Sequence, residues 1–186
     1  LLMAAEAAIP RRDRSLPRLQ RWPSNLTLVL MNTVIARLTA PIIPVALALS
    51  LAESGQGLLN VLSVPGWAAF AISVLALDFA IWAQHLVFHK VGPLWRLHRM
   101  HHADQDIDVT TGARFHTIEI LLSLIIKLGV VALLGAPAAA VLAFEVLLNA
   151  TAMFNHANLA LPRRWDAILR LLVVTPDMHR VHHSWH

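Results

Sequence analysis

The sequence predicts an all-α integral-membrane protein, a bundle of about four transmembrane helices in two hairpins with a histidine-rich cap on the cytoplasmic side. Three observations predict this fold. Hydrophobic residues make up 57% of the 186 residues, charged residues only 14%, and the mean hydropathy is +0.60, a composition typical of membrane proteins. Charged residues are rare in two long blocks, 26–89 and 115–155. The 11 histidines collect mainly in the polar segments that border these blocks.

Residues 1–25 form a basic segment before the first apolar block. The short apolar run Leu1–Pro10 precedes the arginines of this segment, which is the reverse of the order in a cleavable signal peptide. We therefore expect residues 1–25 to be a cytoplasmic N-terminal segment and residues 26–186 to be one membrane-embedded domain. Because the chain ends soon after a histidine motif, we expect that domain to be truncated at its C-terminus.

Residues 26–50 make the first predicted span. A hydrocarbon core of roughly 30 Å requires about 20 helical residues at 1.5 Å each, so this segment is long enough to cross it. Arg37, Pro41 and Pro44 interrupt the apolar pattern, and they predict an irregular helix.

The second span of the first hairpin is predicted at Trp67–Lys90, after a turn region that contains Pro65 and Gly66. This segment has no internal glycine or proline, and as one helix it would extend about 36 Å, longer than the hydrocarbon core. Its C-terminal end, which carries His85 and His89, should therefore emerge on the cytoplasmic side.

A second hairpin is predicted at Thr117–Leu134 and Pro137–Asn155, with its turn at residues 135–137. Lys127 lies near the middle of the first limb. A charge inside a membrane usually faces the bundle interior or extends to the interface, so we expect a structural role for this lysine.

Shorter helices are predicted outside the two hairpins. Leu94–His102 should form a short helix, and an acidic loop follows it. After the second hairpin the chain becomes amphipathic, and Pro162 and Pro176 bound a predicted interfacial helix.

Most of the 15 lysine and arginine residues lie in three segments, 1–25, 90–114 and 156–186. The connections within the two hairpins, 51–65 and 134–137, contain none. The positive-inside rule then places all three basic segments in the cytoplasm. These residues flank apolar blocks and do not form a basic patch with interleaved aromatic residues, so they do not indicate a nucleic-acid partner.

Histidines form the clearest motif of the chain. Residues three or four apart on a helix share a face, so one H-x-x-x-H pair and two H-x-x-H-H triplets would each project as a cluster. By the predicted topology all of them lie at the same membrane face, and their number exceeds what one ion needs, so we expect two metal ions. The nine predicted ligands are His85, His89, His98, His101, His102, His156, His179, His182 and His183.

Residue type alone leaves the metal and the function open. Imidazole suits zinc, copper, iron and nickel. The absence of cysteine excludes thiol catalysis and cysteine-ligated clusters, and the absence of H-E-x-x-H argues against a zinc metalloprotease. Besides an oxygenase, two alternatives remain. A bis-histidine haem electron carrier would need paired histidines on facing helices, and a histidine-rich zinc-binding or transport protein would need ionisable residues midway along several spans.

The stretch from Asp78 to His183 resembles the fatty acid hydroxylase/sterol desaturase superfamily of integral-membrane, non-haem di-iron enzymes. The motifs that carry the resemblance are H-L-V-F-H at the end of the 78–89 helix, L-W-R-L-H-R-M-H-H from Leu94, T-T-G-A-R-F-H-T-I-E from Thr110, H-A-N from His156 and P-D-M-H-R-V-H-H-S from Pro176. The resemblance implies that the nine histidines bind two iron ions, for which zinc can substitute, and that O2 is a co-substrate. It also implies a lipid substrate, which would be hydroxylated or desaturated.

Further site residues follow from the resemblance and from helical spacing. His116 resembles a family position, and we expect it to be a ligand or to lie behind one. Asp78 lies seven residues before His85 and therefore on the same helix face, which makes it the first candidate for a carboxylate that orients a ring N–H. Glu119, Asp108 and Asp177 are weaker candidates.

The resemblance also implies partners and a location. The reaction needs two external electrons, and the chain has no G-x-G-x-x-G motif for a dinucleotide. We therefore expect an external donor of the ferredoxin or cytochrome type with its reductase. The protein should reside in the inner or plasma membrane, take its substrate from lipid, and keep its N-terminus and histidines cytoplasmic.

Overall fold

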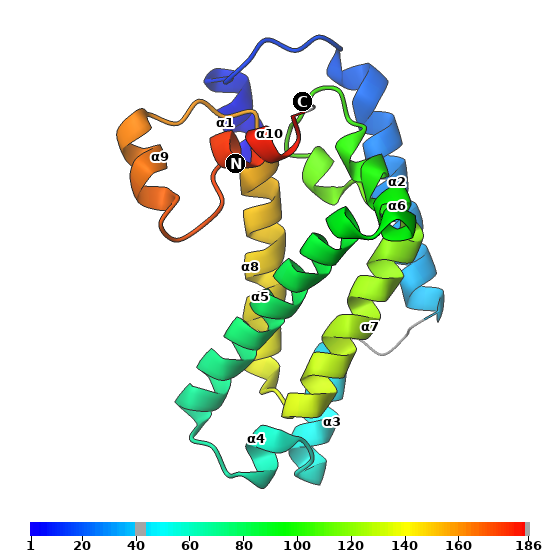
Figure 1. Ribbon diagram of the computed structural model, residues 1–186, viewed down its shortest axis with the longest axis vertical. Coiled ribbons are helices and arrows are strands. Elements are labelled where there is room, and N and C mark those ends of the chain that lie inside the picture. The colour runs from blue at the N-terminus through cyan, green and yellow to red at the C-terminus, as the bar shows by residue number, and fades with distance from the viewer. Residues whose placement is uncertain (40–43, 185–186) are drawn as a thin grey trace. The chain divides into compact units, whose positions relative to one another are not determined.

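The structure is a computed structural model that describes residues 1–39 and 44–184. These residues form helices and one isolated β-bridge but no strand, which confirms the predicted all-α class. The helices (Figure 1) are α1 (Leu2–Ala8), α2 (Arg18–Thr39), α3 (Pro44–Ser54), α4 (Leu58–Val61), α5 (Gly66–Lys90), α6 (Gly92–His102), η1 (Thr111–Ala113, a 3₁₀ turn), α7 (Thr117–Leu134), α8 (Ala138–His156), α9 (Arg163–Leu169) and α10 (Pro176–His182).

The chain divides into two compact units. Unit 1 consists of Leu1–Met31, Arg99–His116 and Asn149–His186, and unit 2 consists of Asn32–His98 and Thr117–Leu148. Unit 1 therefore contains both ends of the chain and the connection between α6 and α7, whereas unit 2 contains most of the long apolar helices.

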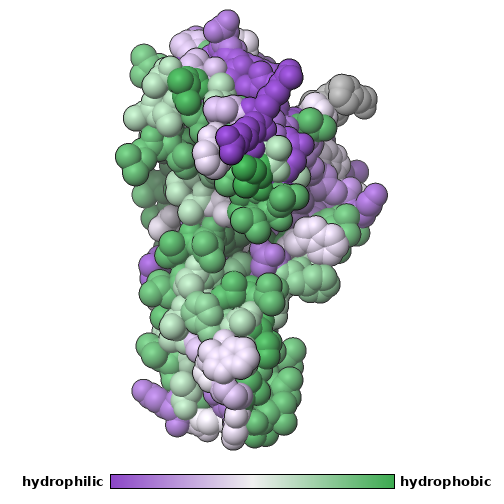
Figure 2. Space-filling model, turned by 90° about the vertical axis from the view of Figure 1, so that its left-hand side faces the viewer, coloured by the Kyte–Doolittle hydropathy of each residue, from purple (hydrophilic) through white to green (hydrophobic). Residues whose placement is uncertain are grey.

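Four helical stretches are long and apolar enough to cross a membrane, as predicted. One lies within Arg18–Val61, and the others are α5, α7 and α8. Only 11% of the residues of α7 are buried inside the protein, so the helix offers apolar surface to lipid. On the face of the molecule that Figure 2 draws, apolar residues cover much of the surface.

Unit 2 is organised around α7, which packs against both α3 and α5 (Figure 1). Leu77 of α5, Val131 of α7 and Phe144 of α8 belong to its buried core. Lys127 of α7 and Glu145 of α8 form an ion pair with 2.6 Å between Nζ and Oε1. Polar contacts of this kind contribute to helix association in lipid, where burying apolar surface against other apolar surface adds little.

Two glycine turns meet at one end of unit 2. Gly57, after α3, has φ +95°, and Gly135, after α7, has φ +65°. Residues with a side chain rarely adopt these backbone conformations. A Cβ on Gly57 would lie 2.2 Å from the Cα of Gly135, so only glycine permits this approach. The contact joins the α3–α4 connection to the predicted turn of the α7–α8 hairpin.

The helix boundaries agree closely with the predictions for α5, α7 and α8, and they differ at the first span. α2 begins at Arg18, well before residue 26, because Arg21 and Asn25 hydrogen-bond to the loop after α6 and so extend the helix with polar residues. The described part of α3 begins at Pro44. Pro41, part of the predicted irregularity, lies outside the described residues.

Unit 1 contains a helix that was not predicted, α1, with Glu6 fully buried on it. The Oε2 of Glu6 accepts hydrogen bonds from the backbone N–H groups of Val109 and Asn158, at 3.2 and 3.1 Å. Arg14 and Arg18 contact its other oxygen. One buried carboxylate thus ties the N-terminal segment to the two loops that follow the histidine-bearing helices α6 and α8.

Candidate metal centre

Four histidines of unit 1 converge, and we call them the four-histidine cluster. His101 lies in the last turn of α6, His156 ends α8, His179 lies on α10, and His183 directly follows α10. One ring nitrogen from each lies within 4.8 Å of the others. The Nε2 atoms follow one another at 2.9 Å from His101 to His156, 2.9 Å from His156 to His179, and 3.1 Å from His179 to His183. Segments distant in sequence therefore direct their imidazoles to one point.

Backbone carbonyls on the far side of two rings determine where their protons lie. The Nδ1 of His101 is 3.1 Å from the carbonyl oxygen of Arg114, and the Nδ1 of His156 is 2.6 Å from that of Ala152. A carbonyl only accepts, so both Nδ1 atoms donate, and in the neutral rings each Nε2 carries a lone pair. Two lone pairs that face each other at 2.9 Å repel, and a cation that accepts both removes the repulsion. The donor set therefore fits a metal ion.

A second group in unit 1 combines His102, His182 and His183, whose ligand nitrogens also lie within 4.8 Å of one another. The rings of His102 and His183 stack with centroids 4.0 Å apart, and both residues are buried, whereas His182 is exposed. His183 belongs to both groups of unit 1.

Unit 2 contains a three-histidine cluster made of His85 and His89 on α5 and His98 on α6. Their ring centroids lie 4.7 to 4.8 Å apart, and their ligand nitrogens are within 4.8 Å of one another. The two histidines of α5 share a helix face because they are four residues apart, as the sequence predicts. His98 is fully buried.

Glu119 lies behind His98. Its Oε1 accepts a hydrogen bond of 2.7 Å from the Nδ1 of His98, which leaves the lone pair of that ring on Nε2. Glu119 is only 5% exposed, and its Oε2 has no hydrogen-bond partner among the described residues. A buried carboxylate that holds the far nitrogen of a histidine is typical of metal sites, where it orients the ring and offsets the charge of the ion.

The turn η1 supports the four-histidine cluster from one side. A Cβ on Gly112 would lie 2.7 Å from the carbonyl oxygen of Ala152 and 3.2 Å from the Nδ1 of His156, so glycine permits the turn to approach α8 at this histidine. Phe115, directly after the turn, stacks on the ring of His101 with centroids 4.4 Å apart. The T-T-G-A-R-F-H run therefore shapes the cluster although none of its side chains belongs to it.

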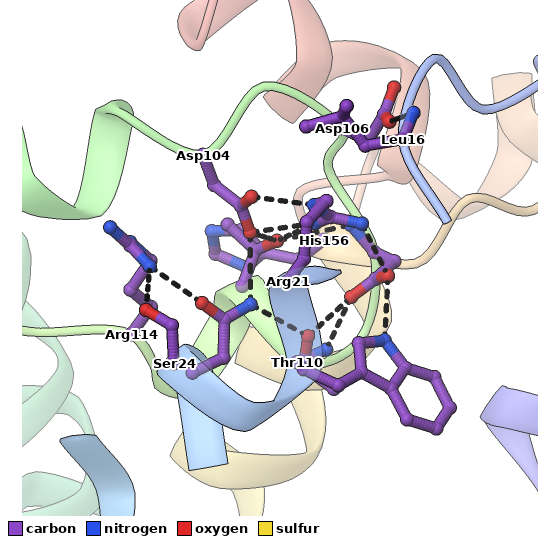
Figure 3. Close-up of polar contacts among 12 residues, drawn as sticks. Leu16, Arg21, Ser24, Asp104, Asp106, Thr110, Arg114 and His156 are labelled. Atoms are coloured by element: carbon purple, nitrogen blue, oxygen red, sulfur yellow. Dashed lines mark hydrogen bonds and ion pairs between the residues drawn. The ribbon is translucent and has the colours of Figure 1, made fainter. Parts of the chain in front are cut away.

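Arg114 connects that run to α2. Its Nη1 donates to Asn25 at 2.7 Å and to Ser24 at 3.0 Å (Figure 3). Its Nε donates to the carbonyl of Met100 at 3.0 Å. Because the carbonyl of Arg114 accepts from His101, these contacts also hold that acceptor in place.

Arg21 of α2 anchors the acidic loop that follows His102. It is 5% exposed and makes two hydrogen bonds to Asp104, at 2.8 and 2.7 Å, and one to Asp108 at 2.9 Å (Figure 3). Trp22 also donates to Asp108. A buried network of this kind favours one arrangement of the loop, because removing any member leaves a buried charge without its partner.

The environment of Asp108 keeps it ionised. Burial raises the pKa of its carboxyl, but hydrogen bonds from Thr110 and Trp22 and the charge of Arg21 outweigh burial, so the pKa lies below its ordinary value. The structure thus places Asp108, predicted as a candidate behind a ligand, in the anchor of the loop.

The other predicted site residues belong to none of the histidine groups that the described residues form. Asp78 is exposed on α5, about 10 Å along the helix axis from His85. Asp177 accepts hydrogen bonds from Arg11 and Arg180 at the start of α10. His116 lies between η1 and α7, and none of the metal-binding groups formed by the described residues includes it.

Several residues that shape the site were not singled out from the sequence, namely Glu6, Arg21 and Arg114. A signal for the Arg21 network was present, because the acidic run at 104, 106 and 108 complements the arginines of residues 1–25 in charge. For Glu6 there was none, since an isolated acid in a short apolar run has no pattern that predicts its partners.

Comparisons with known proteins show which family the chain is similar to. The profile of the fatty acid hydroxylase family matches residues 70–186, a segment that contains every histidine of the clusters. Ornithine lipid hydroxylase OlsE of Rhizobium tropici is 28% identical over 113 residues, which are 61% of this chain and 33% of that protein. The chain thus spans a third of the length of this relative. No solved structure matches the chain.

Proposed function

Because the chain belongs to the fatty acid hydroxylase family, we propose that it is a membrane oxygenase that uses O2 and two iron ions to hydroxylate a C–H bond of a lipid. The histidines of the unit 1 groups and of the three-histidine cluster are the proposed ligands. Desaturation begins with the same removal of a hydrogen atom, but hydroxylation requires less control of the substrate, so hydroxylation is the proposed outcome.

The pair His101 and His156 carries this proposal. Both rings are buried, both Nδ1 atoms donate to backbone carbonyls, and the two Nε2 atoms face each other at 2.9 Å. Neutral imidazole ligands of this kind suit iron as well as zinc, and iron is the metal that the resemblance of the histidine motifs implies.

The residues of the chain have separable roles. When bound, a pair of irons would supply open coordination positions and the electrons that activate O2 for the oxidation of an unactivated C–H bond. The carbonyls of Arg114 and Ala152 and the carboxylate of Glu119 would hold the rings in the ligating tautomer. Burial of His98 and His101 would limit access of water to the cluster to which each belongs.

The proposed substrate is a polar membrane lipid. The relative from Rhizobium tropici is named for an ornithine lipid, which supports a lipid with a polar head as the class. Exposed apolar residues along the membrane-spanning helices, such as Leu75 and Phe79 on α5, would contact its acyl chains.

The proposed orientation keeps the N-terminus and the histidines in the cytoplasm, in the inner or plasma membrane. It rests on the distribution of basic residues. An external electron donor, a ferredoxin or a cytochrome with its reductase, would then reach the protein from the cytoplasm.

The test combines isotope labelling with a matched pair of variants. Cells that express the protein are grown under isotopically labelled dioxygen, and their lipids are analysed by mass spectrometry. We expect a labelled hydroxyl group in one lipid class, lost with His156→Ala and retained with His116→Ala, a histidine outside the clusters. Iron-loaded protein that introduces no labelled oxygen into any lipid would contradict the proposal.

A further inference from the structure

A polar pocket of about 350 Å³ lies within unit 1. One water molecule occupies about 30 Å³ in the liquid, so the pocket has room for about a dozen, or for the polar head of a lipid without its acyl chains. The residues of its wall that matter for binding are His102, His183, Arg12, Arg14, Asn158 and Arg180. The pocket therefore adjoins two of the imidazoles of the metal centre.

Arg180 is the buried cation of this wall, at 9% exposure. Its Nη1 donates to Asp177 at 2.9 Å, and its Nη2 makes a long contact of 3.4 Å with the Oδ1 of Asn158. Asp177 also accepts a hydrogen bond of 2.9 Å from Arg11. Two guanidinium groups thus share one carboxylate, which leaves positive charge in excess.

Arg12 adds a further positive charge to the same wall. The side chain of Asn158 binds the backbone of Arg12 on both sides, accepting from its N–H at 3.1 Å and donating to its carbonyl at 2.8 Å. This holds the main chain of Arg12 at the pocket, and its guanidinium makes no hydrogen bond to a described side chain. The charges of Arg11 and Arg12 both act on Arg180.

The wall also contains three carboxylates, Asp13, Asp104 and Asp106. Asp104 is held by Arg21 at 2.7 Å, and Asp106 accepts hydrogen bonds from Ser15 and from the backbone N–H of Leu16, as Figure 3 shows for Leu16. Arg14 has its own partner in Glu6. Arg12 is thus a guanidinium of the wall with no ion pair to a described residue, and it lines the same pocket as Arg180, which shares the carboxylate of Asp177 with Arg11.

We propose that this pocket binds the anionic group of the lipid substrate, a phosphate or a carboxylate of its polar head, through Arg180 and Arg12. Guanidinium groups bind such anions with two parallel hydrogen bonds, and the bonds are strong where water is excluded. The identification of the bound lipid as the substrate rests on the proposed function, whereas the binding itself does not. The substrate class is thus narrowed to membrane lipids that carry an anionic group in the head.

The test measures binding to the iron-loaded protein in detergent without oxygen, so that no turnover is needed. The probes are dihexanoyl phosphatidic acid, dihexanoylglycerol with the same chains and no anion, and inorganic phosphate. We expect the phosphatidic acid to bind at least about tenfold more tightly than either of the others, since it combines the anion with the chains.

Two arginine variants and one control identify the site. Arg180→Gln and Arg12→Gln should each weaken the binding of phosphatidic acid, by about tenfold and about threefold respectively, and leave dihexanoylglycerol unchanged. Arg163→Gln removes an exposed charge on α9, outside the pocket, and should match the unchanged protein. Arg12→Gln keeps the backbone contacts with Asn158, so it remains informative if Arg180→Gln does not fold.

Three outcomes would overturn the proposal. Phosphatidic acid could bind Arg12→Gln as tightly as it binds Arg163→Gln, inorganic phosphate could bind as tightly as the lipid, or dihexanoylglycerol could bind best. A protein that binds the anionic lipid as expected and still hydroxylates nothing would refute the proposed function and leave the pocket assignment standing.

Discussion

The two units hold their histidines by different means. In the four-histidine cluster of unit 1, neutral backbone carbonyls accept from the far nitrogens of His101 and His156. In the three-histidine cluster of unit 2, the carboxylate of Glu119 accepts from His98. Either acceptor fixes the tautomer and the orientation of the ring, but a carboxylate also brings a negative charge to the site, whereas a carbonyl does not. The same residue type therefore builds two sites of different electrostatics.

The largest expected effect comes from the cluster of unit 1. His156→Ala removes the nitrogen that lies between those of His101 and His179, so we expect iron bound by unit 1 to be lost and hydroxylation to fall by at least about 100-fold. Metal analysis of the purified variant and lipid mass spectrometry measure the two effects. His116→Ala is the control, and equal losses of iron in both variants would show that the clusters are wrongly assigned.

Glu119→Gln examines the carboxylate that distinguishes unit 2. Glutamine keeps an oxygen that can accept from His98 but removes the charge, so metal affinity or activity should fall by about 10- to 100-fold. Glu119→Ala should cost more, because it also removes the acceptor. A competition titration with a metal chelator compares the variants. If Glu119→Gln behaves like the unchanged protein, the charge of Glu119 does not distinguish the two clusters.

Asp108→Asn should act on stability in unit 1. The substitution leaves Asp104 as the only carboxylate partner of the buried Arg21 guanidinium. Breaking a buried ion pair typically lowers the free energy of unfolding by about 3 kcal/mol. Thermal unfolding in detergent should therefore begin at a lower temperature. Asp78→Asn, at an exposed position of α5, is the matched control, and an equal shift of the two variants would contradict the proposed anchor.

Lys127→Met should have the smallest effect, and it concerns unit 2. The ion pair with Glu145 is partly exposed, and polar contacts between membrane helices contribute about 1 kcal/mol. The double variant with Glu145→Gln should be no less stable than Lys127→Met alone, since the partner charge is then removed too. Unfolding measured with denaturant compares the two, and additive losses would show that the residues do not interact.

The helices that cross unit 2 were predictable because their signal is local. α5 and α7 are long, apolar and free of internal proline, and their observed ends lie within one residue of the predicted ones. The start of α2 was not predictable in this way, because Arg21 and Asn25 read as loop residues until the acidic loop that binds them is known.

The histidine motifs predicted which side chains gather, but the sequence could not rank the acids around them. Helical spacing favoured Asp78, which shares a face with His85 but lies two turns away and is exposed. Glu119 contacts His98 through the packing of α7 near α6, a contact between segments that spacing along one helix does not describe. Pairings across the fold, such as Glu6 with Val109 and Asn158, were hidden for the same reason.

The iron content of the anaerobically reconstituted protein shows whether the histidines form two metal sites. We expect about two irons per chain in the unchanged protein and about one in His156→Ala, since the three-histidine cluster with Glu119 keeps its own donors. A chain that binds no iron, or that retains all of it in His156→Ala, would contradict the account.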